Sequence, residues 1–344
     1  MTGQLEVSRE EHLGIIALNR PEAINALSTD MIHGIIRTLE QWRDDDGIRV
    51  VLFEGRGPRG FCAGGDVRAV RQMVLEGRVA QADEFFAAEY FMNGMIATFP
   101  KPTVALTHGV VMGGGIGIAG HCRYRFTTPE SKWAMPEAAI GFVSDVGCNQ
   151  ILAKAPLHRA LAFLMAGVTV GAADAVALGL CDCVYDPARR EAVLDAIAAT
   201  ARAAQPEAAL GHLVQAEMLA GGEAAFVPTA DAIPALDWTD PAAIVAGVTD
   251  PALAAALKSR SPTSLVAILE SHLAARRLPA IQEVLAVDLA LAQLLCPMPD
   301  FAEGVRAVLV DKDQRPGWQP PDFGGVPVAA IRSAIAAAIG PKLV

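Results

Sequence analysis

The sequence predicts an α/β protein with a layered core followed by a helical region. Up to about residue 204, short apolar runs typical of buried strands alternate with segments of helical periodicity. Beyond that point only helical patterns continue. Hydrophobic residues make up 52% of the 344 residues and charged residues 19%, which is enough apolar material for a large core. We therefore expect a core over residues 1–204 and a helical C-terminal extension over residues 205–344.

The expected elements follow from local patterns. Strands are predicted where apolar runs end at turn residues, at 14–18, 48–53, 103–107, 123–127 and 181–184. Helices are predicted where apolar residues recur every three or four positions. In the core these are 28–42 with Ser28 as N-cap, 66–75, 82–98, a helix towards 154, one from 158 and one near 172–178. In the extension they are 210–219, 251–257, 263–273, 281–295 and 328–339, with residues 221–241 as a looser connection.

Two glycine-rich turns follow two of the expected strands. Residues 113–115 are three consecutive glycines, and residues 61–66 read Phe-Cys-Ala-Gly-Gly-Asp. Such glycines are costly in backbone entropy unless the backbone must approach something closely. If the two strands are neighbours, the N–H groups of Gly65 and Gly114 can converge as an oxyanion hole. A tight turn packed against a neighbour is the alternative, and the order of the glycines does not match a dinucleotide-binding fingerprint.

Three carboxylates lie in apolar or glycine-rich surroundings. Glu137 follows Met-Pro in a stiff loop, Asp145 stands at an expected helix start, and Glu89 lies among aromatic residues. Burial would raise the pKa of such a group and suit it to acid–base chemistry. Each has an ordinary alternative: a hydrogen bond to nearby backbone for Glu137, a helix-start charge for Asp145 and a solvated helix position for Glu89. No G-x-S-x-G motif is present, so we interpret His108 as structural.

Composition limits the partners. The net charge of −10 argues against nucleic acid and against an anionic membrane surface. The longest uncharged run, 102–120, is interrupted by glycines and His108, so we expect no membrane span. The six cysteines show no paired metal spacing, so we expect reduced thiols and no metal. The first residues lack a basic segment followed by an apolar run, so we expect no signal peptide and a cytoplasmic protein.

These residues together resemble the crotonase (enoyl-CoA hydratase/isomerase) superfamily. The resemblance rests on Leu-Asn-Arg-Pro at 18–21 with Asn-Ala-Leu at 25–27, on the turn at 61–66, on Lys-Pro at 101–102 with the triple glycine, and on Met-Pro-Glu at 135–137. It implies a spiral of ββα units that binds a CoA thioester, with CoA as part of the substrate and no separate cofactor. It also implies that the thioester oxygen lies between the N–H groups of Gly65 and Gly114, and that CoA is lined by Glu22, Ala23, Ile24, Gly64, Gly65 and Asp66.

Two departures point to one branch of that superfamily. Hydratases carry a catalytic glutamate where this chain has Gly117, and glycine where it has Asp145. The 3-hydroxyisobutyryl-CoA hydrolase branch is similar to this chain at both positions, in Glu89-Tyr90, and in the segments 261–265 and 301–313. The resemblance implies that Glu137 and Asp145 are catalytic, and that Glu89, Gly114, Glu137 and Asp145 bind the substrate.

The sequence is therefore compatible with three functions. The first is hydrolysis of a short 3-hydroxyacyl-CoA, with 3-hydroxyisobutyryl-CoA in valine breakdown as the expected substrate. The second is hydration or isomerisation of an enoyl-CoA, since isomerisation needs only one base. The third is a non-catalytic acyl-CoA-binding protein, against which the intact Glu137 and Asp145 argue. The superfamily often forms trimers and dimers of trimers, so a homo-oligomer is expected.

Overall fold

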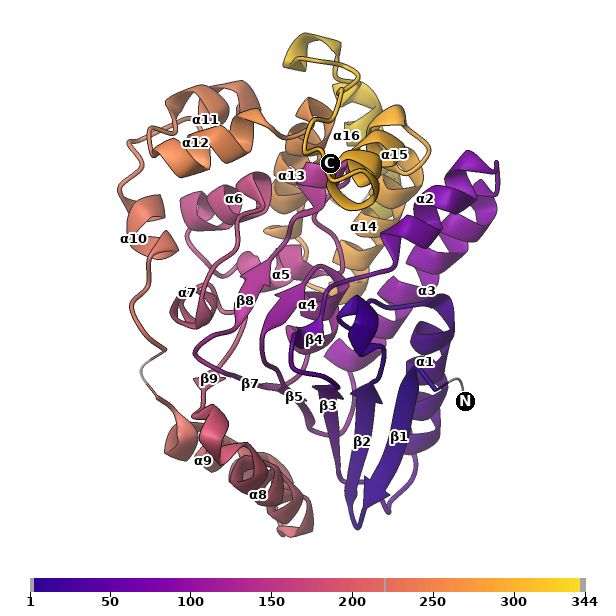
Figure 1. Cartoon of the computed structure of the whole chain (residues 1–344), viewed down its shortest axis with the longest axis vertical. Coiled ribbons are helices and arrows are strands. Elements are labelled where there is room, and N and C mark those ends of the chain that lie inside the picture. Colours follow the sequence, from indigo (N-terminus) through magenta and orange to yellow (C-terminus); the bar gives the residue numbers. More distant parts are fainter. Residues whose placement is uncertain (1–2, 220, 341–344) are drawn as a thin grey trace. The chain divides into compact units, whose positions relative to one another are not determined.

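Six strands form one sheet in the order β1-β2-β3-β5-β7-β9 in this computed structural model, which describes residues 3–219 and 221–340 (Figure 1). Part of the segment inspected for a signal peptide, residues 1–2, lies outside this range. β1 (Leu5–Glu10) pairs antiparallel with β2 (Leu13–Leu18). The other pairs are parallel and join β2, β3 (Val50–Gly55), β5 (Thr103–Leu106), β7 (Tyr124–Thr127) and β9 (Cys183–Val184). The predicted strands are thus present, and the largely exposed edge strand β1 is an addition.

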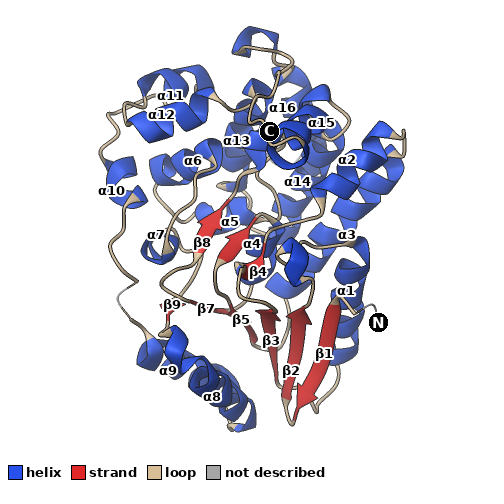
Figure 2. Cartoon of the chain, viewed as in Figure 1, coloured by secondary structure: helices blue, strands red, loops and turns tan. Residues whose placement is uncertain are grey.

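A second, smaller sheet has the order β4-β6-β8 (Figure 2). Its strands are β4 (Gly60–Cys62), β6 (Val110–Met112) and β8 (Lys132–Ala134). Each one follows a strand of the larger sheet along the chain, so that β3, β5 and β7 continue into β4, β6 and β8. The sequence did not predict these strands because three residues are too few to show an alternating pattern.

The chain divides into two units, each made of separate segments. The first unit comprises Met1–Gly65, Phe91–Trp133 and Val170–Ala225, and the second comprises Asp66–Tyr90, Ala134–Thr169 and Phe226–Val344. This differs from the expected division near residue 204. Leu210 and Val214 are buried in the same apolar cluster as the strand residues Val104 and Phe126, so the segment after residue 204 packs with the sheet.

In the first unit, helices follow the strands of the two sheets. Ser28 caps α1 (Thr29–Arg43) as predicted, with its Oγ accepting the N–H of Met31 at 3.3 Å. The other helical elements of this unit are η1 (Pro21–Ala23), α4 (Gly114–Ala119), α7 (Ala172–Ala177), η3 (Pro187–Arg189), α8 (Arg190–Arg202) and α9 (Pro206–Glu217). The long α3 (Val79–Ala97) begins in the second unit and ends in the first.

The second unit is largely helical. It includes α2 (Val67–Leu75), η2 (Glu137–Ile140), α5 (Cys148–Leu152), α6 (Leu157–Ala166), α10 (Phe226–Asp231), α11 (Pro241–Gly247), α12 (Pro251–Lys258), α13 (Pro262–Ala275), α14 (Ile281–Leu295), α15 (Pro299–Val305), η4 (Arg306–Val310), η5 (Phe323–Gly325) and α16 (Val328–Ile339). The predicted helices of the extension are present. The predicted loose connection over 221–241 contains α10, whose Phe226 is buried and packs edge-on against Phe163.

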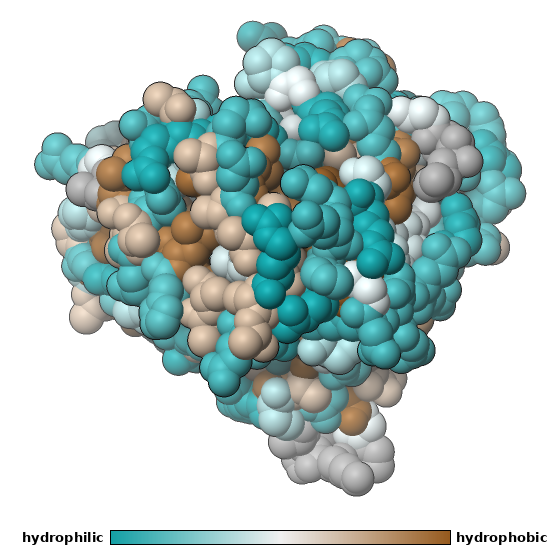
Figure 3. Space-filling view, turned by 90° about the horizontal axis from the view of Figure 1, so that it is seen from below, coloured by the Kyte–Doolittle hydropathy of each residue, from teal (hydrophilic) through white to brown (hydrophobic). Residues whose placement is uncertain are grey.

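The face of the molecule seen from below is mostly polar (Figure 3). On the face shown in Figure 3, hydrophilic residues cover most of the area and strongly hydrophobic ones form small patches between them. Within the described residues, no single helix is both long and apolar enough to cross a membrane. Ile281–Leu295 and Pro299–Val310 reach the required length and composition only as a pair, with an 88° bend between them.

Candidate active site

The two glycine turns of the first unit lie side by side. β4 and β6 are parallel neighbours, with Gly60 opposite Val110, so the turns that follow them leave the small sheet at the same edge. A Cβ atom on Gly115 would lie 2.5 Å from the carbonyl oxygen of Cys62. One on Gly64, whose φ is +104°, would lie 3.5 Å from the nitrogen of Gly114. The backbones therefore approach so closely that glycine is required at position 115.

Helix α4 starts directly at the second glycine turn. Its first hydrogen bonds are donated by the N–H groups of Ile116 and Gly117 to the carbonyl of Gly113, at 2.8 and 3.1 Å. The N–H of Gly114 comes before these donors and so is not used by the first turn of the helix. The structure thus brings the two glycine turns that contain Gly65 and Gly114 together. Their joint action as an oxyanion hole stays a prediction.

The segment expected to line CoA runs along the first glycine turn. The N–H of Ala63 donates to the carbonyl of Ile24 at 2.9 Å, and the N–H of Leu27 donates to the carbonyl of Gly64 at 2.8 Å. Glu22 and Ala23 lie in the short helix η1, and Ile24 is its C-cap. Glu22 points to solvent, with its side chain 72% exposed and its carboxylate 3.8 Å from Arg20 Nε. Asp66 begins the second unit, where it caps α2.

Asn25 fixes this segment and was not singled out from the sequence as a site residue. Its fully buried side chain accepts the N–H of Arg20 at 2.8 Å. Its amide also lies within hydrogen-bond distance of the carbonyls of Arg56, Gly60 and Phe61, at 3.0–3.1 Å. Its φ of +55° lies in the left-handed region, which asparagine tolerates better than most residues. One side chain therefore ties the expected CoA segment to the β3–β4 connection.

We expect Asn25→Ala to lower the free energy of unfolding by about 2–4 kcal/mol, because it leaves several buried backbone groups without a partner. Urea denaturation of the variant and the unchanged protein measures the difference. Asn19→Ala, which removes a more exposed asparagine of the same loop, serves as the control. A loss below about 1 kcal/mol in Asn25→Ala would contradict the anchoring role.

Four carboxyl groups are buried together in the second unit. Glu89 on α3, Glu137 at the start of η2, Asp145 in the following loop and Asp288 on α14 are 2%, 7%, 5% and 0% exposed. Within the described residues, Oε1 of Glu89, Oε2 of Glu137 and Oδ1 of Asp288 have no hydrogen-bond partner. The hydroxyl of Tyr90 donates to Oδ2 of Asp145 at 2.5 Å. These four residues are called the acid cluster below.

The acid cluster holds protons more tightly than ordinary carboxyl groups do. Burial raises the pKa of Glu89 and of Glu137 well above the usual range, and the charge of Asp145 raises both further. Burial raises the pKa of Asp145 to about 7, although hydrogen bonds from Tyr90 and from its own backbone N–H lower it. Burial and the charge of Asp145 also raise the pKa of Asp288. The cluster thus provides protonated acids and a carboxylate near neutral pH.

We expect the folded protein to lose stability as pH rises from about 4 to about 7. The reason is that the acid cluster stays protonated in the folded chain while the same carboxyls ionise in the unfolded chain. For Asp145 this stability is fully present below its unfolded pKa of 3.8 and is lost as pH rises to about 7. Asp145→Asn should therefore flatten the fall of Tm with pH, whereas Asp195→Asn on the exposed face of α8 should not. Thermal unfolding measures Tm against pH in the unchanged protein and in both variants. The same slope in all three would contradict this prediction.

The loop that carries Asp145 is stabilised by contacts from two helices of the extension. Asn149 donates to the carbonyl of Ser144 at 2.8 Å, and its Oδ1 lies 3.1 Å from Nδ1 of the buried His272 on α13. On the other side, Oδ2 of Asp288 accepts the N–H of Gly147 at 2.8 Å. The C-terminal helices therefore belong to the structure of the site.

Sequence reasoning missed Asp288 and the role of Tyr90. A signal for Asp288 was present: it is the one charged residue in the run Val284 to Leu295 of a helix whose neighbouring Val287 and Leu291 are buried. A lone acid on an apolar helix face needs a partner or a function. Its nearness to Asp145 could not be read from spacing because the two lie far apart in the sequence.

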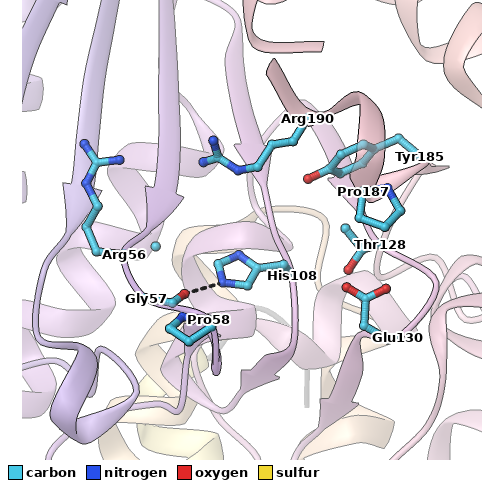
Figure 4. Close-up of a pocket in the computed structure, with 10 residues that line it drawn as sticks. Arg56, Gly57, Pro58, His108, Thr128, Glu130, Tyr185, Pro187 and Arg190 are labelled. Atoms are coloured by element: carbon cyan, nitrogen blue, oxygen red, sulfur yellow. Dashed lines mark hydrogen bonds between the residues drawn. The ribbon is translucent and has the colours of Figure 1, made fainter. Parts of the chain in front are cut away.

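A separate cavity of about 390 Å³ lies in the first unit, where β3, β5, β7 and β9 end (Figure 4). No predicted site residue lines it. His108 Nε2 lies 2.8 Å from the carbonyl oxygen of Gly57, in keeping with a structural role. Arg56 and Arg190 both bind the buried Glu54, at 2.7 and 2.5 Å, which offsets their charge. Within the described residues, no group of three or more His, Cys, Asp or Glu side chains is arranged to hold a metal ion.

The chain is similar to known proteins over almost its whole length. The sequence model of the enoyl-CoA hydratase/isomerase family matches residues 13–335. The mitochondrial 3-hydroxyisobutyryl-CoA hydrolase of Danio rerio is 34% identical over 324 residues, which cover 91% of this chain and 84% of the relative. A carnitinyl-CoA dehydratase from Mycobacterium thermoresistibile aligns with a TM-score of 0.86 at 30% identity, over 99% of this chain and 98% of that one. An enoyl-CoA hydratase from Rhodobacter sphaeroides 2.4.1 gives a TM-score of 0.83 at 32% identity, over 97% of each chain.

The two sheets, the paired glycine turns and these similarities define the class of the protein. The chain belongs to the enoyl-CoA hydratase/isomerase family and has its crotonase-like α/β fold with a helical C-terminal region. This confirms the family and the fold class that the motifs predicted. The chemistry of the family is that of CoA thioesters.

Proposed function

We propose that the protein hydrolyses a short 3-hydroxyacyl-CoA, with 3-hydroxyisobutyryl-CoA as substrate, to the free hydroxy acid and CoA. The observation that carries this proposal is the acid cluster, in which Glu137 and Asp145 are buried with Glu89 in one unit. The relative from Danio rerio bears the name of this hydrolase, which supports the same reaction. The reaction would belong to valine breakdown.

The proposed roles follow from the state of each group. The N–H groups of Gly65 and Gly114 would stabilise the negative charge that develops on the thioester oxygen. Glu137, with an oxygen free of partners among the described residues, would act through the fraction of this carboxyl that is ionised, which its raised pKa limits. It would either remove a proton from an attacking water or attack directly and form an anhydride that water then cleaves. In both routes the C–S bond breaks and the CoA sulfur leaves.

Asp145 and Glu89 are assigned to the water and to the substrate hydroxyl. Asp145 is oriented by Tyr90, and Glu89 offers an unpaired buried oxygen, Oε1. A buried carboxyl with an unpaired oxygen binds a hydroxyl group well and disfavours an acyl group that lacks one. The acid cluster therefore supports a 3-hydroxyacyl rather than a plain acyl substrate. CoA itself would be held along Glu22 to Ile24 and Gly64 to Asp66.

Hydration or isomerisation of an enoyl-CoA is the second candidate, favoured by the names of the two similar structures. Hydration with two glutamates needs an acid at position 117, where this chain has a glycine buried in α4. Isomerisation with Glu137 alone as base is not affected by that glycine. The two candidates therefore differ in the substrate that they consume.

A paired assay separates the candidates. The protein is mixed with 3-hydroxyisobutyryl-CoA and release of the CoA thiol is measured, and in parallel with crotonyl-CoA while the enoyl absorbance is followed. Thiol release from the first without loss of the enoyl signal in the second supports hydrolysis. The reverse result supports hydration. Tight binding of acyl-CoA without turnover of either would instead support a binding protein.

We further propose that the protein acts in the cytoplasm as a homo-oligomer, a trimer or a hexamer. The basis for the assembly is that members of the superfamily often form trimers and dimers of trimers. Light scattering of the purified protein measures the assembly, and fractionation of the source cells measures the location. A monomer, or recovery in another compartment, would overturn the respective proposal.

A further inference from the structure

The loop after Asp145 adopts an unusual backbone conformation. Val146 and Gly147 have φ values of +52° and +72°, so two consecutive residues are left-handed. Glycine adopts this conformation freely, but a β-branched residue such as valine rarely does. Such a conformation persists only where surrounding contacts hold it. The loop must therefore be fixed from outside, and this loop carries the carboxylate of Asp145.

Asp288 supplies one of the contacts that hold the loop. It lies 141 residues further along the chain on α14, and its Oδ2 accepts the N–H of Gly147 at 2.8 Å. It is completely buried, and its other oxygen, Oδ1, has no partner among the described residues. A carboxyl buried in this way is costly, and a leucine of similar size would pack more favourably against the apolar neighbours on α14. Packing alone thus does not explain an aspartate at this position.

We propose that Asp288 is a positioning residue: by accepting the N–H of Gly147, it holds the left-handed turn at Val146 and so fixes the carboxylate of Asp145 for the reaction. Two side-chain contacts then bear on where Asp145 points. Tyr90 holds its Oδ2 directly, and Asp288 holds the backbone two residues beyond it. Replacing a group that orients a catalytic side chain in this way commonly lowers activity, although the group itself does not touch the substrate. Only the effect of Asp288 on activity rests on the proposed function; its effect on the loop does not.

The neighbouring contact from α13 shows why the effect should be local. Asn149 ties the start of the same loop to His272. Its side-chain amide donates to the carbonyl of Ser144, and its Oδ1 lies 3.1 Å from Nδ1 of the His272 ring. Removing the Asp288 contact therefore leaves one end of the loop attached while it takes away the hydrogen bond that holds Gly147. We expect a displaced Asp145 rather than a collapsed unit.

The test compares Asp288→Asn with Asp288→Leu in the full-length protein. Asparagine keeps an oxygen that can accept the N–H of Gly147, whereas leucine keeps the volume and removes the acceptor. We expect Asp288→Leu to lower kcat for 3-hydroxyisobutyryl-CoA about 10- to 100-fold with KM within about twofold, and Asp288→Asn to stay near the unchanged protein. Asp174 is the matched control, because it is a buried aspartate of the first unit whose Oδ2 accepts the N–H of Ala225 at 3.2 Å. Asp174→Leu should not show the same pattern of a lower kcat with a nearly unchanged KM.

Hydrogen exchange gives a readout that does not depend on the reaction. Peptides covering residues 144–149 should exchange faster in Asp288→Leu than in the unchanged protein, and Asp288→Asn should restore the protection. If the unchanged protein hydrolyses no 3-hydroxyacyl-CoA, the proposed function fails while the exchange result still decides the positioning role. If Asp288→Leu does not fold, Asp288→Ala removes the same acceptor and takes its place.

Two results would overturn the proposal. One is unchanged kcat together with unchanged exchange in Asp288→Leu, which would show that the loop does not need the contact. The other is an Asp288→Asn variant as impaired as Asp288→Leu, which would show that the acidic group itself, rather than the acceptor for Gly147, is what matters.

Discussion

Replacing Glu137 with glutamine should lower kcat for 3-hydroxyisobutyryl-CoA by about 10²- to 10⁴-fold, the range typical for loss of a general base or nucleophile. Glutamine has the same shape but can neither accept the proton of water at neutral pH nor form an anhydride. The buried site should tolerate it, because burial and the charge of Asp145 already favour an uncharged group at this position. Steady-state kinetics by thiol release measures the loss.

The matched control is Glu130→Gln, which changes an exposed glutamate seven positions earlier, at the rim of the separate cavity. It should keep full activity. Calorimetric titration with CoA should give the same affinity in Glu137→Gln as in the unchanged protein, because the variant leaves every residue expected to line CoA unchanged. Full turnover in Glu137→Gln would remove Glu137 from the mechanism. If hydroxylamine converts Glu137 of the working enzyme into a hydroxamate, the anhydride route is supported over direct attack by water.

The second large effect is expected at Asp145. Asp145→Asn should lose most turnover, on the order of 10²-fold or more, because the carboxylate that orients water or the substrate hydroxyl becomes a neutral amide. CoA affinity should again be kept. Since the hydrogen bond from Tyr90 lowers the pKa of Asp145, removing it in Tyr90→Phe should raise that pKa above its value of about 7. The rising limb of kcat against pH should then move to higher pH.

Tyr90→Phe also separates the effect of the charge of Asp145 from the effect of its position. It keeps the carboxylate of Asp145 and should therefore retain more activity than Asp145→Asn at high pH. Phe91→Leu, at the exposed neighbouring position on α3, is the control and should leave the pH profile unchanged. A shift of the profile to lower pH in Tyr90→Phe, or undiminished turnover in Asp145→Asn, would contradict the assigned role.

Much of the fold was open to prediction because its signals are local. The apolar runs of β2, β3, β5, β7 and β9 end at turn residues, and the glycine turns after β4 and β6 stand out by residue type alone. The reason why position 115 requires glycine, the close carbonyl oxygen of Cys62, is visible only in the tertiary structure. The strands of the small sheet were not predictable, since their pairing rather than their sequence makes them strands. Helical periodicity alone predicts a separate extension after residue 204, because it does not reveal that Leu210 and Val214 pack with the sheet.

The candidate site divides in the same way. By itself, the sequence determined the family motifs, the glycine turns and the three acids Glu89, Glu137 and Asp145, because residue type and short spacing carry that information. Only the tertiary structure decided that these acids are buried in one unit, that Tyr90 holds Asp145, and that Asp288 joins them through Gly147. The physical reason is that a raised pKa and a held loop depend on burial and on neighbours that lie far away along the chain, and no local pattern encodes those contacts.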